Sequence, residues 1–335
     1  MQHLKQLATT AIVAFVTLTS SAVLAQDTIR ILTAPTGSIV HTTGSAISSV
    51  VSKNTDYTML AAPMSGPQIY VPQVDAGRAE FALLNAADAH EAFQGGLGYR
   101  QAYKNLRLAG VGFTNELGVI VPADSDIKTG QDLKGKRVSG AFSAHKTCQQ
   151  LASAQMANFG LSWDDVSVVP VTHSRTAVQA LGDGRVDAAL CVPLGQAIVQ
   201  EINAQTPVRF ISLDNAAAAV ERTRAAFPAG EIRGYKAGDS VGLINDAYVW
   251  SYPFYLAVNK DVPDEVVYSV VKTISDHVTD LRSISGVFNR WLPEQMIGTD
   301  ITLPVHDGAK RYYQDVGLWN DNIEGANRAL LNIAQ

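Results

Sequence analysis

A short pattern occurs twice in the chain, 107 residues apart, and it constrains the fold more than any other feature. The first copy, Gly-Arg-Ala-Glu-Phe-Ala-Leu-Leu, begins at Gly77, and the second, Gly-Arg-Val-Asp-Ala-Ala-Leu-Cys, begins at Gly184. In each copy an apolar-periodic segment ends at the glycine and a short apolar run follows. This is typical of a helix that ends at glycine and leads into a buried parallel strand. The pattern therefore predicts two similar α/β lobes.

The ends of the repeated strands predict where a ligand lies. In open α/β sheets, ligands bind outside the carboxyl ends of the strands. Asn85 follows the first repeated strand, and Val192-Pro193 end the second. Both ends are expected to face one crevice, so the predicted fold class is a two-lobed α/β clamshell with a ligand cleft between the lobes and two hinge crossings.

The first 25 residues have the features of a secretory signal peptide. They contain Lys5, no acidic residue, an apolar stretch from Leu7 to Val16, and the small-residue pattern Val23-Leu24-Ala25. A retained membrane anchor is the alternative, but threonines and serines interrupt the run, and a spanning helix needs about 20 predominantly apolar residues. Residues 1–25 are predicted to be cleaved after export, which leaves about 310 residues from Gln26 outside the cytoplasm. No later segment predicts membrane insertion of the mature chain.

Charge and cysteine content narrow the partners and the compartment. The net charge is −5, and loss of Lys5 makes it −6, so the chain lacks the basic balance expected of a partner for nucleic acid or an anionic membrane. The two cysteines, Cys148 on a predicted helix and Cys191 at the end of a strand, both belong to the second lobe. A disulfide is possible in an oxidising compartment, and two buried, inert thiols are the alternative.

The chain order predicts that the first lobe is built from two separate parts. We expect lobe 1 to include residues 26–121, lobe 2 to include residues 122–248, and residues 249–335 to form a return crossing and the rest of lobe 1. A polar connector is expected at 124–133, and a long amphipathic helix is expected to begin at Pro263. The expected strands are 29–33, 57–61, 81–85, 106–110, 117–121, 137–141, 166–171 and 248–258, with further helices from about residues 42 and 146.

Motifs for catalysis are missing from the sequence. There is no nucleophile elbow, P-loop, dinucleotide fingerprint or metal-binding histidine spacing. The paired carboxylates Asp164-Asp165 and Asp124-x-Asp126 fall at helix starts and loops, where solvated acids are common. We therefore expect no catalytic residue, no cofactor and no metal, and an enzyme is not the predicted class.

In lobe 1, polar residues stand at the predicted cleft ends of strands. Thr36-Gly37-Ser38 leads into the first helix, whose free N–H groups and positive dipole end suit an anion. Asn85 follows a strand, and its amide can both donate to and accept from a ligand. Ser65 and Gln68 lie in a loop on the same side, where a helix cap is the alternative role.

In lobe 2, a similar loop adds a cation. Ser143-Ala144-His145-Lys146-Thr147 follows a strand and opens the next helix. For Lys146 the alternative is a solvated surface lysine, and for His145 it is a helix cap or an exposed imidazole. His173 follows the next strand and is either a cleft residue or part of an exposed loop. Three aromatic residues of the return strand, Trp250, Tyr252 and Phe254, could line the pocket, although core packing is favoured.

With these motifs in place, the chain resembles the TAXI solute-binding proteins of TRAP transporters. The stretch from Leu303 to Gly317 contains Pro304-Val305-His306-Asp307-Gly308-Ala309, which is similar to that family's Pro-Leu-His-Pro-Gly-Ala near the C-terminus, followed by paired aromatics and a glycine. Residues 261–268 resemble the family's acidic, Pro-containing entry to a long helix. The resemblance covers nearly the whole mature chain.

The resemblance implies a type II-like periplasmic binding protein that binds a small organic anion, most simply a carboxylate, and delivers it to the membrane subunits of a TRAP transporter. Val40 and His41 stand where the family favours aromatics, and His41 is included among the expected contacts. Pro67, Tyr70 and Ala86 replace polar residues of the family, which argues against its better-known amino-acid and dicarboxylate ligands. The same fold serving an ABC importer or a sensor kinase is the alternative; an enzyme or a ligand-free scaffold is less expected.

Overall fold

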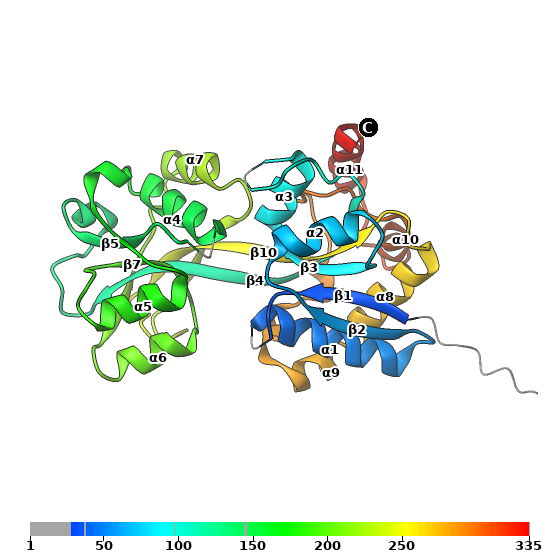
Figure 1. Ribbon diagram of the computed structural model, residues 1–335, viewed down its shortest axis with the longest axis horizontal. Coiled ribbons are helices and arrows are strands. Elements are labelled where there is room, and N and C mark those ends of the chain that lie inside the picture. The colour runs from blue at the N-terminus through cyan, green and yellow to red at the C-terminus, as the bar shows by residue number, and fades with distance from the viewer. Residues whose placement is uncertain (1–27, 37, 97, 144–145, 335) are drawn as a thin grey trace, which may run out of the picture.

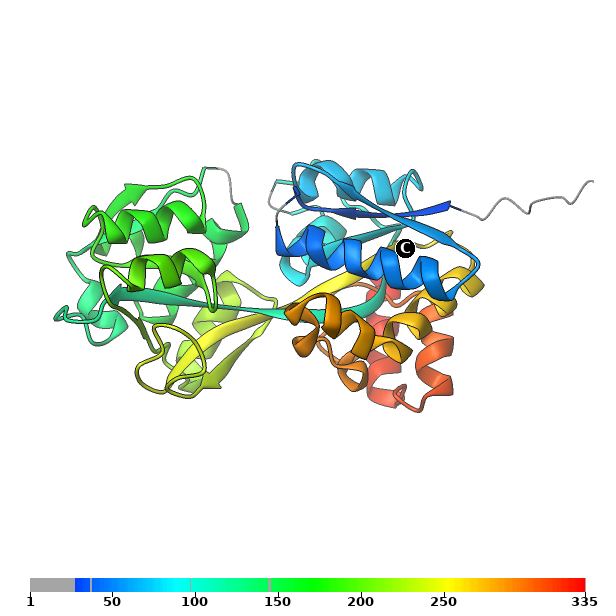
Figure 2. The same cartoon turned by 90° about the horizontal axis from the view of Figure 1, so that it is seen from below.

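The chain folds into two α/β lobes joined by two long strands, as the computed structural model in Figures 1 and 2 shows. The structure describes residues 28–36, 38–96, 98–143 and 146–334. The predicted signal peptide, Gly37 and His145 lie outside the described residues. The predicted two-lobed α/β clamshell is confirmed.

Lobe 1 is built on a parallel sheet. Strand β1 (Thr28–Thr33) pairs in parallel with β2 (Thr58–Pro63) on one side and with β3 (Phe81–Asn85) on the other. All five residues of β3 are buried, as expected for a strand covered on both faces. Figure 1 shows α1 (Ile39–Asn54) on one face of this sheet and α2 (Pro67–Asp75) with α3 (Ala86–Gln94) on the other.

Lobe 2 repeats the same order of elements. Strand β5 (Arg137–Gly140) pairs in parallel with β6 (Ser167–Pro170) and bridges to Ala188, next to β7 (Ala189–Pro193). The order β1-α1-β2-α2-β3 in lobe 1 therefore corresponds to β5-α4-β6-α5-β7 in lobe 2. The sequence repeat covers the α2-to-β3 and α5-to-β7 connections, where Gly77 (φ +66°) and Gly184 (φ +68°) adopt the left-handed conformation that favours glycine.

The acidic residue of the repeat has an equivalent role in both lobes. Glu80 accepts a hydrogen bond at 2.7 Å from the backbone N–H of Arg30, in the first strand of lobe 1. Asp187 accepts one at 2.8 Å from the backbone N–H of Arg137, in the first strand of lobe 2. The repeated Glu/Asp position therefore ties the segment that leads into the third strand of each lobe to the first strand.

The lobes are joined by the middle parts of two long strands. Strand β4 runs without a break from Leu106 to Pro122, so the prediction of two separate strands at 106–110 and 117–121 is wrong. Its polar middle stays in the ladder because Thr114 and Glu116 pair with Pro253 and Ser251 of β10 (Ala247–Asn259). The last part of β4 pairs with β7 and β8 in lobe 2. Residues 124–133, expected as a connector, follow this strand and include a short 3-10 turn.

The C-terminal part of the chain packs on lobe 1. The backbone of Leu108, in β4, accepts from His306 at 3.0 Å, and the His306 side chain caps α10. A Cβ atom on Gly308 would lie 2.2 Å from the carbonyl oxygen of Asp264, so glycine is required where α10 meets α8. The motif behind the family resemblance is therefore a packing motif. The C-terminal elements are α8 (Asp264–Asp276), α9 (Val278–Ile284), η3 (Gly286–Arg290), η4 (Pro293–Gln295), α10 (Asp307–Asp315) and α11 (Asp321–Ala334).

The remaining elements complete lobe 2. In Figure 1, α4 and α7 cover one face of its sheet, and α5 and α6 cover the other. None of the helices in the described ranges is long and apolar enough to cross a membrane. These elements are η1 (Gly130–Leu133), α4 (Lys146–Asn158), η2 (Trp163–Asp165), α5 (Ser174–Gly182), α6 (Ala197–Asn203), β8 (Val208–Ile211), α7 (Ala217–Ala226) and β9 (Glu231–Tyr235).

Candidate ligand-binding cleft

A cleft of about 820 Å³ lies where the two lobes meet. Lobe 1 contributes the starts of α1 and α3, and lobe 2 contributes residues at the starts of α4, α5 and α6. Strands β4 and β10 contribute the residues of the crossing. The lining residues are Ala34, Ser38, Ile39, Val40, Asn85, Asn115, Glu116, Leu117, Cys148, Ser174, Pro193, Leu194, Gly195, Gln196, Ala197, Tyr235, Asp239, Ser240, Tyr252, Phe254 and Arg290.

Two predicted residues of lobe 1 line the cleft, and both cap helices. Ser38 is the N-cap of α1, and its Oγ accepts from the backbone N–H of His41 at 3.1 Å. Asn85 is the N-cap of α3, and its Oδ1 accepts from the backbone N–H of Asp88 at 2.8 Å. These caps satisfy one N–H of each first turn, while the other N–H groups of a first turn have no partner within the helix. The positive ends of α1 and α3 are therefore presented to the cleft.

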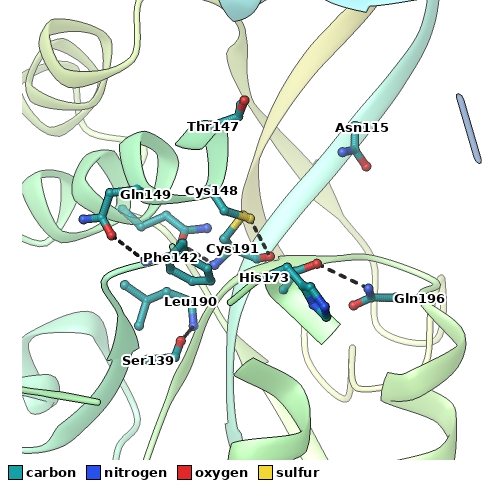
Figure 3. Close-up of a disulfide and its surroundings, with 12 residues drawn as sticks. Asn115, Ser139, Phe142, Thr147, Cys148, Gln149, His173, Leu190, Cys191 and Gln196 are labelled. Carbon is teal, nitrogen blue, oxygen red and sulfur yellow. Dashed lines mark hydrogen bonds between the residues drawn. A yellow bond between two sulfur atoms is a disulfide. The ribbon is translucent and has the colours of Figure 1, made fainter. Parts of the chain in front are cut away.

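A disulfide joins the start of α4 to strand β7 of lobe 2. Cys148, the third residue of α4, is bonded to Cys191, and Cys148 lines the cleft (Figure 3). Of the two alternatives left open by the sequence, the structure contains the disulfide. Cys191 (φ +56°) and Ala141 (φ +48°), which follows β5, are the described non-glycine residues with positive φ. Such conformations cost of order 1–3 kcal/mol and cluster at functional sites.

The bottom of the cleft is formed by the crossing strands. Asn115 donates to the hydroxyl of Tyr252 at 3.2 Å, and both residues line the cleft. Phe254 stacks on Phe113 with ring centroids 4.6 Å apart. Tyr252 and Phe254 are therefore both buried and cleft-lining, whereas Trp250 is fully buried in the core and donates to a backbone carbonyl.

The lobes are also joined by a side-chain hydrogen bond. Asp88, in the first turn of α3, is buried and accepts from the hydroxyl of Thr147, the second residue of α4, at 3.0 Å. The same carboxylate accepts from Asn85 at 2.6 Å, from Tyr99 at 3.3 Å and from Gln68 at 3.4 Å. Burial raises the pKa of Asp88, against the hydrogen bonds that lower it. Figure 3 shows Thr147 pointing away from the disulfide.

The other predicted site residues in the described part of the chain do not line the cleft. Their role in binding stays a prediction. His41 contacts the hydroxyl of Thr33 through Nδ1 at 2.9 Å, and Gln68 is bonded to Asp88. His173 caps α5 next to Ser174, which does line the cleft. The exposed members of this group are Thr36, Ser65, Ser143 and Lys146.

Several lining residues were not found by sequence reasoning. Asn115 and Glu116 lie between the two strands that the sequence predicts separately, where the polar run Thr114-Asn115-Glu116 within an apolar stretch is the only signal. Arg290 precedes the buried Trp291 in a short 3-10 turn and has no local signal. Ser174 and Gln196 stand at helix starts, and the same argument that selected Ser38 would have selected them.

Metal binding has no support in the described residues. Across these ranges, no group of three or more His, Cys, Asp or Glu side chains is arranged to hold a metal ion.

The arrangement of two α/β lobes around one cleft is shared by solved structures. A TctC solute-binding protein from Polaromonas, without ligand, superposes with a TM-score of 0.54 at 13% identity, covering 93% of this chain and 96% of that one. A structure described as a periplasmic transporter gives 0.51 at 15% identity, with 92% and 97% covered. The fold is that of the periplasmic solute-binding proteins.

Within that class, the family is defined by sequence. The model of the NMT1-like family matches residues 31–317, which is most of the chain. The protein belongs to the NMT1-like family.

Proposed function

We propose that the protein is an extracytoplasmic receptor that binds a small organic anion, a carboxylate, between its lobes. The observation that supports this function best is that helices from both lobes begin at one cleft. Ser38 and Asn85 stand at the starts of α1 and α3, and Cys148 and Ser174 at the starts of α4 and α5. Helix starts carry free N–H groups and a partial positive charge, so together they favour a negatively charged ligand.

The proposed site extends to the predicted residues around these helix starts. We include Thr36, Gly37, His41, Ser65, Gln68, Ser143, His145, Lys146 and His173 as proposed ligand contacts. Apart from Ser65 and Gln68, which come from the segment where α2 begins, they stand within a few sequence positions of lining residues. The lobe boundaries predicted from the sequence, 26–121, 122–248 and 249–335, are kept as the proposed domain division.

The proposed partner is the membrane part of a TRAP transporter, and the proposed location is the periplasm. Support comes from the resemblance to the TAXI solute-binding proteins and from the features of residues 1–25. A gene for a fused multi-span permease next to the receptor gene supports TRAP, and genes for an ATPase or a sensor kinase contradict it.

Native mass spectrometry of the receptor purified from the periplasm tests whether a solute is bound. A ligand at about 100 times its dissociation constant adds roughly 2.7 kcal/mol of stability, which a thermal melt detects. A bound mass that matches an organic acid supports the proposal. A receptor that binds only neutral solutes, in this experiment and in a melt screen, contradicts it.

A matched pair of variants tests the charge of the ligand. In S38D the new carboxylate still caps α1 but places a negative charge in the cleft, whereas S38N keeps the cap without a charge. A charge several ångström from an anionic ligand is expected to weaken binding roughly 10-fold or more in S38D, with little change in S38N. Equal affinities of the two variants would show that the ligand is not an anion.

A further inference from the structure

The cleft has one basic side chain among the described residues that line it. This is Arg290, from η3 in the C-terminal part of lobe 1. Its side chain is 36% exposed, so the guanidinium is in reach of a solute. The acidic lining residues are Glu116, which is 2% exposed, and Asp239, which lies in an exposed turn of lobe 2.

Arg290 is held in place by the packing of its neighbours. Phe288 and Trp291 are fully buried, and their ring centroids lie 5.5 Å apart. The ring of Trp291 packs so closely on β4 that a Cβ atom on Gly112 would lie 2.7 Å from it. The backbone that carries Arg290 is thereby fixed against the strand that carries Glu116.

One side of the Arg290 guanidinium is already occupied. Nη1 donates to Oε2 of Glu116, and Oε1 of Glu116 accepts from the hydroxyl of Thr114. The buried carboxylate is thus paired with a cation and hydrogen-bonded, as a buried charge requires. Nε and Nη2 of Arg290 have no protein partner in the described ranges.

The unoccupied edge has the geometry that binds a carboxylate. Nε and Nη2 point in the same direction and form a fork that matches the two oxygens of a planar carboxylate. Arg137 uses this same edge elsewhere in the protein, where Nε and Nη2 donate to the two oxygens of Asp187 at 3.2 and 2.7 Å.

Resting on the proposed function, we propose that Arg290 binds the carboxylate of the ligand through its Nε–Nη2 edge, and that Glu116 restricts the ligand to a monocarboxylate. Glu116 already balances the charge of Arg290, and Asp239 adds a further negative charge to the lining. The first carboxylate of a ligand binds to the Nε–Nη2 edge of Arg290 and interacts with the partial positive charge of the helix starts. A second carboxylate finds no unbalanced cation among the described lining residues, because the proposed contact Lys146 is exposed at the start of α4 and does not belong to the lining.

Tyr235 supports this assignment from lobe 2. It lines the cleft, and burial together with the charge of Glu116 raises its pKa to about 12. The hydroxyl is therefore neutral at neutral pH and adds no charge to the cleft lining.

The proposal is tested by melting and calorimetry with a panel of solutes. The panel contains short-chain, hydroxy, oxo and aromatic monocarboxylates, the amide of each acid, and dicarboxylates of matching chain length. The wild-type protein is expected to bind at least one monocarboxylate and to reject its amide and the matching dicarboxylate. For that monocarboxylate, R290Q is expected to lose roughly 10- to 150-fold in affinity, because hydrogen bonds to a charged group are lost.

Three further variants separate binding from folding. R290K keeps the charge but not the fork, so it is expected to lose less affinity than R290Q. R185Q removes an exposed arginine that pairs with its neighbour Asp183, and it is expected to bind as the wild type does. E116Q removes the negative charge beside the fork, and it is expected to raise the affinity for dicarboxylates relative to monocarboxylates. If Arg290 and Glu116 had only a structural role, E116Q would leave the ratio of dicarboxylate to monocarboxylate affinity unchanged.

Distinct results overturn this inference and the proposed function. Binding of an organic anion that is unaffected in R290Q, with R290Q folded, refutes the assignment of Arg290 and leaves the receptor function standing. Equal binding of matched mono- and dicarboxylates by the wild type refutes the role of Glu116. Binding of neutral solutes only, or of no solute, refutes both the inference and the organic-anion receptor.

Discussion

Replacing Thr147 with valine removes the hydroxyl that bonds lobe 2 to lobe 1 and keeps the shape of the side chain. Thr147 is 7% exposed and Asp88 is 6% exposed, so the bond between them is shielded from water. When the lobes separate, water replaces each partner of this bond. The net contribution of a hydrogen bond to a charged group is therefore about 1.5–3 kcal/mol, and we assign this value to the free energy of lobe contact. The ratio of contacting to separated lobes is therefore expected to fall roughly 10- to 150-fold in T147V.

Small-angle scattering without ligand measures this change. T147V is expected to show a larger radius of gyration than the wild type, together with faster hydrogen exchange at the start of α4. Ligand affinity should fall as well, because the apparent dissociation constant rises as the binding-competent arrangement becomes less populated. T147S keeps the hydroxyl and is the matched control, expected to scatter as the wild type does. If T147V and the wild type give the same scattering and exchange, the bond does not hold the lobes together.

Three further predictions follow from buried groups of the described structure. The pKa of Asp88 is raised by burial, so the folded protein binds more protons at this carboxyl group than the unfolded chain does, and the contribution of Asp88 to the free energy of unfolding is expected to become more favourable as pH falls through the range above the ordinary value of 3.8. Denaturant unfolding that shows the same pH dependence in D88N as in the wild type would contradict this. The disulfide between Cys148 and Cys191 closes a loop of 43 positions and so lowers the entropy of the unfolded chain. The double serine variant is therefore expected to lose about 4 kcal/mol of unfolding free energy, measured by denaturant unfolding. A loss below about 1 kcal/mol would argue against a bridge that constrains the unfolded chain. Arg209 is buried and donates to three backbone carbonyls of the segment that follows β4. In thermal melts, R209M is expected to destabilise lobe 2 by about 3 kcal/mol, and R209K by less. Equal stability of R209M and the wild type would be inconsistent with these bonds.

Much of the fold was predictable because its signals are local. The glycine stops at Gly77 and Gly184 depend on the conformational freedom of one residue and appear directly in the sequence. The apolar runs that follow these glycines predict buried strands, and this signal is local in the sequence as well. The break predicted between residues 110 and 117 was wrong because polar residues there are held in β4 by pairing with β10, which a local pattern does not contain.

The residues of the candidate site also differ in whether a local sequence signal or a long-range contact places them in the cleft. Ser38 and Asn85 line the cleft, and a sequence pattern can single them out because helix caps and strand ends are local features. Their binding role stays a prediction. Arg290 was missed because its position depends on Trp291 packing at Gly112 and on Glu116, which is 174 positions away in the chain.

By itself, the sequence of this protein determined two repeated α/β units, with helix starts expected at a common edge. Periodicity, glycine conformation and capping act within a few residues, so they can be seen without a structure. Only the tertiary structure decided that both lobes share the strands β4 and β10, and that Asp88 meets Thr147. It also decided that Arg290 and Glu116 share the cleft. These contacts arise from long-range packing, in which a side chain's partner is set by the path of the whole chain rather than by its neighbours.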